Sequence, residues 1–507
     1  MFNKVTSGAV LGVDGFLVEV ETDLSSGLPG FDIVGLPDSA VKESKERVRA
    51  AIRNSEFSFP VKRITVNLAP ADVKKSGPSF DLPIAVGILI GIGVISPEAV
   101  DGAFFVGELS LDGTIRPVSG ILPMVLAAQE AGITQVFTSE ENADEAALVS
   151  NLTVYPVKKL VDLVEHFKGT SITPRGRQAY FPADAVSMYD VDFQDVQGQA
   201  YVKRALEIAA AGYHNALMIG PPGAGKTMLA RRMPTILPDM SMDESMEITK
   251  IYSVAGLLSE KSSLVTTRPF RTPHHTASYT SLTGGGNVPS PGEISLAHNG
   301  VLFLDELPEF GKKTLETMRQ PLEDGQITIT RVGGVCTYPS IFLLLAAMNP
   351  CPCGYLGSNK CNCSEVEITR YLDRISGPLL DRIDIHIEVM QIDYNDLTSV
   401  RKSAESSARI KERVEKARAI QAKRYADQKI RFNAKMPAKQ INEFCKPGKE
   451  ASALLKSAFD TMQLSARAYH KILKVARTIA DLEGSDEITA AHTAEAISFR
   501  SLDRKFW

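Results

Sequence analysis

A glycine-rich segment in the middle of the chain has the residue types and spacing of a phosphate-binding loop. Residues 220–227 read G-P-P-G-A-G-K-T and match the pattern G-x-x-x-x-G-K-[ST] in full. An apolar, strand-like run precedes the loop and a helical pattern follows it, as the motif requires. Glycine lets backbone N–H groups turn toward phosphate, Lys226 can reach the β- and γ-phosphate oxygens, and Thr227 can ligate Mg²⁺. The loop predicts binding of ATP and Mg²⁺, and a chance glycine-rich turn is the alternative. The predicted nucleotide contacts are Gly220, Pro221, Pro222, Gly223, Ala224, Gly225, Lys226, Thr227 and Met228.

Two adjacent acids downstream of this loop complete the pattern of a nucleotide hydrolase. Asp305 and Glu306 end an apolar run at 301–304, which predicts a buried parallel strand whose carboxyl end faces a ligand crevice. We expect Asp305 to hold Mg²⁺ through water and Glu306 to polarise the attacking water. Such a strand end is common by itself, but after a phosphate-binding loop it indicates ATP hydrolysis.

Three further polar residues are candidates for the same reaction. Asn349 follows an apolar run at 341–347 and could position the lytic water and sense the γ-phosphate, although an Asn that begins a turn before proline is the alternative. Arg382 is the candidate arginine finger, supplied by a neighbouring subunit, and Arg467 is the candidate sensor arginine. A lone arginine is usually a solvated surface residue, so both assignments depend on the resemblance described below.

Four of the six cysteines are concentrated in one short segment. Their order is C-x-C, seven residues, C-x-C, which is plausible for a structural Zn²⁺ site, although the spacing is tighter than the usual C-x₂₋₄-C. Free thiols are the alternative, and four of them so close together would be prone to oxidation. The candidate zinc ligands are Cys351, Cys353, Cys361 and Cys363.

The elements that must position these residues fall into four segments. Short β-branched runs alternate with helical patterns over residues 1–168, which predicts an α/β unit of its own. Residues 169–188 are polar and aperiodic and are expected to be a linker. Residues 189–392 carry the nucleotide motifs in an α/β core, and residues 393–507 lack β-type runs and predict a helical lid.

Composition limits the function classes. The net charge is −4, so the molecule as a whole is not a basic nucleic-acid binder, and any such contact must come from a local patch or pore. The first residues lack the pattern of a signal peptide, and the most apolar stretch, 82–95, is too short to span a bilayer and is interrupted by glycines. We expect a buried helix there, no membrane association and a cytoplasmic location.

The segments around the acid pair resemble a known group of ATPases. R-P-F-R-T-P-H-H-T at 268–276, G-G-G at 284–286 and P-G-E-I-S-L-A-H-N-G-V-L-F-L-D-E at 291–306 are similar to magnesium-chelatase-related AAA+ proteins. With the N-terminal segment included, the resemblance extends over essentially the whole chain to the bacterial ComM/YifB family of competence proteins. It implies an α/β P-loop AAA+ parallel-sheet core with a helical lid, preceded by a Lon-protease-like α/β domain.

The same resemblance implies a function. It suggests a hexameric ATP-dependent DNA motor, a branch-migration helicase of natural transformation that acts on single-stranded and branched DNA. The alternative is a magnesium-chelatase-type ATPase that remodels a protein partner. We expect the N-terminal segment to argue against that alternative, because chelatase motor subunits lack a Lon-like domain.

Two basic features could contact DNA in such a motor. Residues 325–335 predict a hairpin with a Gly-Gly turn, similar to the pore hairpin of related helicases, and Arg331 near its tip could touch the DNA backbone. An ordinary surface hairpin is the alternative. Residues 401–431 contain eleven Lys/Arg and four Asp/Glu, which is typical of a solvated helix face but could also be an auxiliary strand-contact surface.

The N-terminal segment resembles the Lon peptidase fold without its full catalytic set. Residues 75–79 read K-S-G-P-S, so Ser79 falls where Lon proteases have their nucleophile, and 106–110 and 113–122 resemble the second Lon motif. The catalytic lysine of that motif corresponds to Leu122. Because a serine without a base is a weak nucleophile, we expect no proteolysis and instead a platform for oligomerisation or DNA docking.

Overall fold

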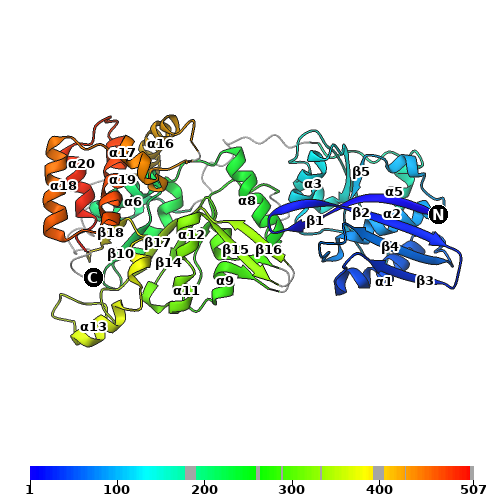
Figure 1. Cartoon of the computed structure of the whole chain (residues 1–507), viewed down its shortest axis with the longest axis horizontal. Coiled ribbons are helices and arrows are strands. Elements are labelled where there is room, and N and C mark those ends of the chain that lie inside the picture. Colours follow the sequence, from blue (N-terminus) through cyan, green and yellow to red (C-terminus); the bar gives the residue numbers. More distant parts are fainter. Residues whose placement is uncertain are drawn as a thin grey trace.

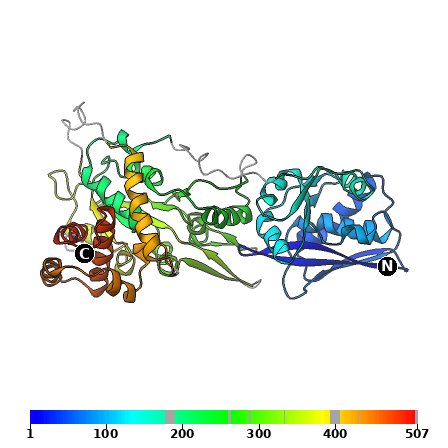
Figure 2. The ribbon, with the colours of Figure 1, turned by 90° about the horizontal axis from the view of Figure 1, so that it is seen from above.

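The computed structural model describes residues 1–176, 190–258, 263–286, 289–331, 334–391, 405–428 and 430–502. Most of the predicted linker, residues 177–188, lies outside these ranges. The molecule is elongated, with the N-terminal unit at one end, the helical lid at the other and the ATPase core between them (Figure 1 and Figure 2). Among the described residues, no helix is both long enough and apolar enough to cross a membrane.

The N-terminal unit is built on a seven-stranded sheet in the order β3-β4-β2-β1-β5-β8-β9. β1 and β2 form a long antiparallel hairpin in which side chains alternate between core and solvent. The strands are β1 (Phe2–Leu11), β2 (Asp14–Ser25), β3 (Gly30–Val34), β4 (Arg63–Ala69), β5 (Ala103–Phe105), β8 (Gln135–Ser139) and β9 (Thr153–Val157), and β6 (Glu108–Leu109) pairs with β7 (Ile115–Arg116) beside the sheet.

Five helices pack around this sheet. They are α1 (Ser39–Asn54), α2 (Asp81–Gly91), α3 (Ile121–Glu130), α4 (Glu140–Ala146) and α5 (Leu160–Phe167). α1 begins after Asp38, whose side chain accepts the Val41 N–H at 2.8 Å and caps the helix. Every residue of α2 is buried, which confirms the buried helix predicted from the apolar run.

The ATPase core contains a five-stranded parallel sheet in the order β11-β14-β17-β10-β18. The strands are β10 (Ala216–Ile219), β11 (Phe270–Arg271), β14 (Val301–Leu304), β17 (Leu343–Met348) and β18 (Ile385–Glu388). All side chains of β10, β14 and β17 are buried, which explains why these strands read as continuous apolar runs. Because neighbouring strands are parallel, the polar residues that follow β10, β14 and β17 meet at one edge.

Helices and short strands surround this sheet. The helices are α6 (Ala200–Gly212), α7 (Lys226–Arg232), α8 (Met242–Ala255), α9 (Tyr279–Thr283), α10 (Glu293–Leu296), α11 (Lys312–Glu316), α12 (Arg319–Asp324), α13 (Glu365–Leu372) and α14 (Gly377–Leu380). β12 (Gly284–Gly285) pairs with β13 (Ser290–Pro291). β15 (Gln326–Arg331) and β16 (Gly334–Pro339) form the predicted hairpin.

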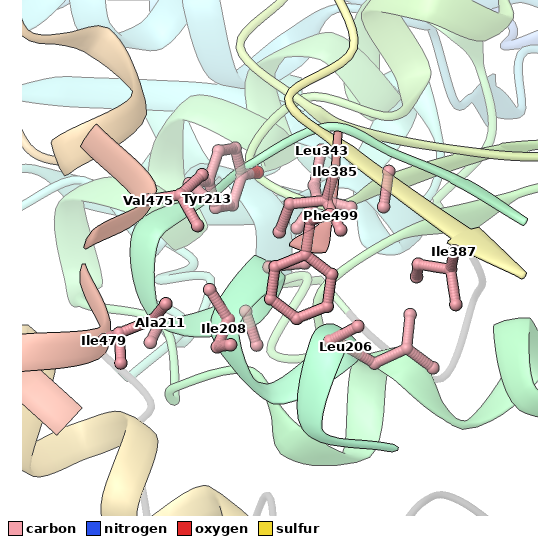
Figure 3. Packing of buried hydrophobic residues seen from close by; sticks show 14 of the residues in the cluster. Leu206, Ile208, Ala211, Tyr213, Leu343, Ile385, Ile387, Val475, Ile479 and Phe499 are labelled. Atoms are coloured by element: carbon pink, nitrogen blue, oxygen red, sulfur yellow. The ribbon is translucent and has the colours of Figure 1, made fainter. Parts of the chain in front are cut away.

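The C-terminal helices share a hydrophobic core with the ATPase sheet. They are α16 (Ser407–Arg424), α17 (Ala438–Phe444), α18 (Lys449–Met462), α19 (Ala466–Leu482) and α20 (Ala490–Ser498). Figure 3 shows Val475 of α19 beside Tyr213 and Ile479 of α19 beside Ala211 of α6, and both belong to one cluster with Ile385 of β18. Burial of this apolar surface fixes the lid on the core.

The N-terminal unit contacts the ATPase core mainly through α3 and α8, which lie side by side in Figure 1. The Gly120 N–H donates to the Ser253 carbonyl oxygen at 3.0 Å, and Met242 and Met246 of α8 pack against the apolar cluster that contains Leu122. The two units are therefore joined by a packed interface as well as by the chain.

Candidate active site

The phosphate-binding loop lies at the carboxyl edge of the parallel sheet, directly after the central strand β10. Gly223 (φ +77°) and Gly225 (φ +87°) have left-handed backbone conformations that other residues seldom adopt. A Cβ at Gly220 would lie 2.2 Å from the Val389 carbonyl oxygen. The glycine positions of the motif are thus required by backbone conformation and by close packing.

Lys226 is held inside this loop by oxygen atoms. Its Nζ donates to the carbonyl oxygens of Gly220 (2.7 Å) and Pro221 (2.9 Å) and to Oδ1 of Asn349 (3.1 Å). Burial lowers the pKa of Lys226, and the nearby Asp305 and Glu306 carboxylates oppose that shift. The structure therefore brings Lys226 and Asn349 together, and phosphate oxygens could replace the loop carbonyls as partners of the ammonium group.

The two expected magnesium ligands are also adjacent. Thr227 Oγ1 donates to Asp305 Oδ2 at 2.6 Å. A hydroxyl and a carboxylate are hard oxygen ligands of the kind that Mg²⁺ prefers, and Mg²⁺ commonly takes few protein ligands together with water and phosphate oxygens. The residues present fit a nucleotide-bound Mg²⁺ ion.

Glu306 stands next to this pair in an unusual conformation. Its backbone is left-handed (φ +54°), which is uncommon for a residue with a side chain and is frequent at functional sites. Its Oε2 lies 3.1 Å from Nδ1 of His275, on the loop after β11. No role was assigned to His275 from the sequence. The one signal in the sequence that could have indicated a role for His275 is its position in the H-H pair of the 268–276 motif.

The two candidate arginines lie elsewhere. Arg382 precedes β18, where its carbonyl oxygen accepts the side-chain N–H of Asn215, the residue just before β10. β10 and β18 run parallel in register, so Arg382 is at the amino edge of the sheet. Strands of this length separate it from the phosphate-binding loop by roughly 10–13 Å along the strand.

The partners of these arginines are acids at that same edge. The Arg382 guanidinium pairs with Glu323 and donates to the Pro378 carbonyl oxygen at 2.6 Å. Arg467, at the start of α19, lies 3.6 Å from Asp381 and is largely exposed. The structure therefore brings the two arginines near each other but not to the phosphate-binding loop of the same chain.

The structure bears differently on the two basic features, the hairpin at 325–335 and the basic segment at 401–431. The hairpin of β15 and β16 is present and pairs Arg331 with Gly334 at its tip, while the Arg331 side chain lies outside the described residues. In the basic segment, several cations are used within the fold: Arg413 pairs with Glu207, Arg424 with Asp481, and Arg418 lies 4.1 Å from the Phe432 ring centroid. These contacts favour a structural role for α16.

The four clustered cysteines converge. Their sulfur atoms all lie within 4.8 Å of one another, with Cys351–Cys353 at 3.4 Å, Cys353–Cys361 at 3.6 Å and Cys351–Cys361 at 3.8 Å. These thiols are free, and a tetrahedral zinc with Zn–S bonds of about 2.3 Å would space its sulfurs by about 3.8 Å. The backbone N–H of Tyr355 is the main cause that lowers the pKa of Cys353 to about 6, whereas burial raises the pKa of Cys351. The other two cysteines, Cys336 and Cys445, are buried elsewhere.

The Lon-like motif of the N-terminal unit lacks a base at the expected place. Leu122 is fully buried, and its N–H donates to Oε1 of Glu145 at 3.1 Å. Ser79 is buried as well. Nζ of Lys75 makes no hydrogen bond within the described part of the chain, so it is not hydrogen-bonded to the serine hydroxyl.

Comparisons with family models and with individual proteins point to the same group of proteins. The family model "Magnesium chelatase, subunit ChlI" matches residues 192–397, a model for its C-terminal part matches 404–500, and "Subunit ChlI of Mg-chelatase" matches 20–142. Competence protein ComM of Haemophilus influenzae is 45% identical over 99% of this chain and 97% of its own length. The uncharacterized protein YifB of Escherichia coli is 44% identical over similar shares. Lon protease of Mycolicibacterium smegmatis is 26% identical over 31% of this chain and 22% of its own length, in the N-terminal region.

Proposed function

Because the chain belongs to the ComM/YifB family of magnesium-chelatase-type AAA+ ATPases, we propose that it is a ring-forming motor that uses ATP hydrolysis to move single-stranded or branched DNA. The family supplies the ATPase class. The observation that carries the motor proposal is the division of the catalytic residues between two edges of one sheet. Lys226, Thr227, Asp305 and Asn349 meet at the carboxyl edge, and Arg382 lies at the amino edge.

Each residue at the carboxyl edge has a defined task. The loop N–H groups and Lys226 bind the β- and γ-phosphates. Thr227 and Asp305 would hold Mg²⁺, which would supply positive charge to neutralise the phosphate oxygens. Glu306 orients the attacking water, and His275 positions its carboxylate. Asn349, which shares a hydrogen bond with Lys226, contacts the γ-phosphate and reports its presence to β17.

The position of Arg382 calls for a second subunit. An arginine at the amino edge cannot reach the nucleotide of its own chain, but a neighbour packed with its amino edge against this carboxyl edge would present Arg382, with Arg467 beside it, to the γ-phosphate. This head-to-tail contact is heterologous, and its repetition gives a closed ring when the rotation between subunits is a whole fraction of a turn. We propose a homo-oligomer of this kind, with six subunits as the family resemblance implies.

DNA is the polymer that we assign to the ring. The relative from Haemophilus influenzae is a competence protein by its printed name. The β15–β16 hairpin provides an extended element whose Arg331 could contact phosphates in a central pore, an interaction that does not depend on sequence. We further propose that the N-terminal unit has no peptidase activity, because the position of the Lon lysine holds the buried Leu122.

A second candidate function is remodelling of a protein partner in the manner of a chelatase motor. Family models with chelatase descriptions match the core, the lid and residues 20–142. The match to residues 20–142 means that the N-terminal segment does not exclude this candidate, contrary to the expectation from sequence. A direct test of DNA dependence must separate the two functions.

That test is ATP hydrolysis by the purified chain with and without single-stranded and four-way-junction DNA, repeated with Glu306→Gln. We expect DNA to stimulate turnover, and Glu306→Gln to lower it by on the order of 10²–10⁴-fold while ATP still binds. Glu309→Gln is the matched control, because Glu309 is a nearby surface acid paired with Arg374. Turnover that needs Glu306 but ignores DNA at low salt would remove the DNA proposal and favour the protein-remodelling candidate.

A further inference from the structure

The segment of residues 351–363, here named the cysteine knuckle, lies directly against the ATP site. It begins two residues after Asn349, which bonds to Lys226. Gly354 has a left-handed backbone (φ +84°), and a Cβ at this position would lie 2.6 Å from Cδ of Pro222 and 3.7 Å from Cγ of Asn349. The knuckle backbone therefore packs on the phosphate-binding loop with no space between them.

This segment has almost no hydrophobic core of its own. Among its residues only Cys351 and Gly354 are buried, and the rest are exposed or half-buried. A short segment of this kind usually needs a cross-link or a metal to keep one conformation. The four convergent sulfurs can provide it, because four thiolates with no open position are typical of structural rather than catalytic zinc.

We propose that the cysteine knuckle binds one structural Zn²⁺ and that the metal-loaded knuckle braces the phosphate-binding loop, so that metal occupancy sets the affinity for ATP. The proposal rests on the assignment of ATP to this loop and is independent of the polymer that the motor moves.

Two contacts carry the effect from the metal to the nucleotide. Gly354 lies between the ligands Cys351 and Cys353 on one side and Cys361 on the other, and its backbone supports Pro222 in the middle of the loop. Asn349 is joined to the first ligand through Pro350 and to Lys226 through its side chain. Loss of the metal would free both supports at once, which raises the entropic cost of ordering the loop around phosphate.

The first experiment measures metal content and ATP affinity of the full chain separately from hydrolysis. We expect one zinc per chain by mass spectrometry of the elements. Withdrawal of zinc by a chelator should weaken binding of a fluorescent ATP analogue by about tenfold or more, equivalent to roughly 1.4 kcal/mol, and added Zn²⁺ should restore it. The Cys361→Ser/Cys363→Ser variant should lose both zinc and affinity. A chain that takes up no zinc, or a zinc-free chain that binds ATP as tightly, would overturn the proposal.

A pair of glycine variants tests the brace itself. Gly354 and Gly357 have nearly equal left-handed backbones (φ +84° and +86°), but a Cβ at Gly357 would meet no atom within 4 Å. Gly354→Ala and Gly357→Ala thus impose similar backbone strain, and only Gly354→Ala displaces Pro222. We expect Gly357→Ala to keep normal ATP affinity and Gly354→Ala to lose about tenfold while both retain zinc. Equal ATP affinities in the two variants would refute the brace. If Gly354→Ala does not fold, zinc withdrawal from the unaltered chain decides the question.

Discussion

The carboxyl edge of the ATPase sheet and the Ser79 region of the N-terminal unit both carry the residue order of an enzyme family, but their side chains have different surroundings. In the ATPase core, Lys226 bonds to Asn349 and Thr227 bonds to Asp305 across separate strands. In the N-terminal unit, the position that would supply a base to Ser79 is the buried Leu122.

The Lon-like motif has a packing role in the structure. Gly120, in the second Lon-like motif, donates its N–H to Ser253 of α8, and Leu122 packs in the cluster that receives Met242 and Met246. The Lon-like motif thus forms the contact between the N-terminal unit and the ATPase core. Packing at this contact accounts for the glycine and the apolar residues of the motif.

The largest loss of ATP hydrolysis is expected when Arg382 is replaced. Replacement by alanine should lower ATP hydrolysis by about 10³-fold or more, because an arginine finger stabilises the charge of the transferring phosphoryl group. ATP binding should change much less than hydrolysis, because an arginine finger acts mainly on the charge of the transition state. Steady-state hydrolysis and analogue binding measure the two effects.

The matched control is Arg374→Ala, which removes a surface arginine paired with Glu309. It should leave hydrolysis nearly unchanged, as expected for an exposed ion pair. Equal losses in the two variants would mean that Arg382 supports folding rather than the reaction.

A smaller effect is expected at Glu145, which accepts the N–H of Leu122. Burial raises the pKa of this carboxyl group from 4.5 to about 7. The folded chain therefore keeps a proton that the unfolded chain loses between pH 4.5 and 7, so the free energy of unfolding should fall as pH rises through this window, by on the order of 3 kcal/mol in total. Glu145→Gln should remove this component and flatten the pH dependence of Tm.

Thermal unfolding at pH 5, 6, 7 and 8 checks this prediction. Glu141→Gln on the same helix is the control, because that side chain is exposed, and it should retain the slope of the unaltered protein. An unchanged slope in Glu145→Gln would show that the pKa of Glu145 is not raised on folding.

The smallest effect is expected at Ser79. Ser79→Ala should change neither ATP hydrolysis nor its response to DNA, because the position of the Lon lysine holds the buried Leu122 and Lys75 Nζ makes no hydrogen bond among the described residues. The unaltered chain should not degrade an unfolded protein substrate in the presence of ATP. ATP-dependent degradation that disappears in Ser79→Ala would show that the Ser79 region is an active peptidase site, contrary to this prediction.

Local patterns were sufficient to predict the strands that carry the ATP site. The apolar runs before Gly220 and Asp305 are β10 and β14, and the run before Asn349 ends in β17. Parallel pairing then required their polar ends to meet, as they do. The helical character of the lid and the β15–β16 hairpin followed from periodicity and from the Gly-Gly turn in the same way.

The contacts that were not predicted join segments far apart in the sequence. A single sequence contains no local signal for which distant segments come together. The approach of His275 to Glu306, the docking of Gly120 on α8 and the packing of Gly354 on Pro222 all join residues far apart in the chain. The position of Arg382 at the amino edge depends on the order of β18 in the sheet. The family resemblance indicated the arginine and a neighbouring subunit, but the sequence could not say at which edge of the sheet the arginine lies.

The most direct test of an ATP site shared between neighbouring subunits mixes two inactive variants, Arg382→Ala and Lys226→Ala. If Arg382 acts on the nucleotide of a neighbouring subunit, mixed rings contain sites with an intact Lys226 from one chain and an intact Arg382 from the next. Random one-to-one mixing should then restore about a quarter of the activity of the unaltered protein, because one in four ordered neighbour pairs is complete. Hydrolysis that stays at the sum of the two variants, in assemblies shown to contain both chains, would contradict a site shared between subunits.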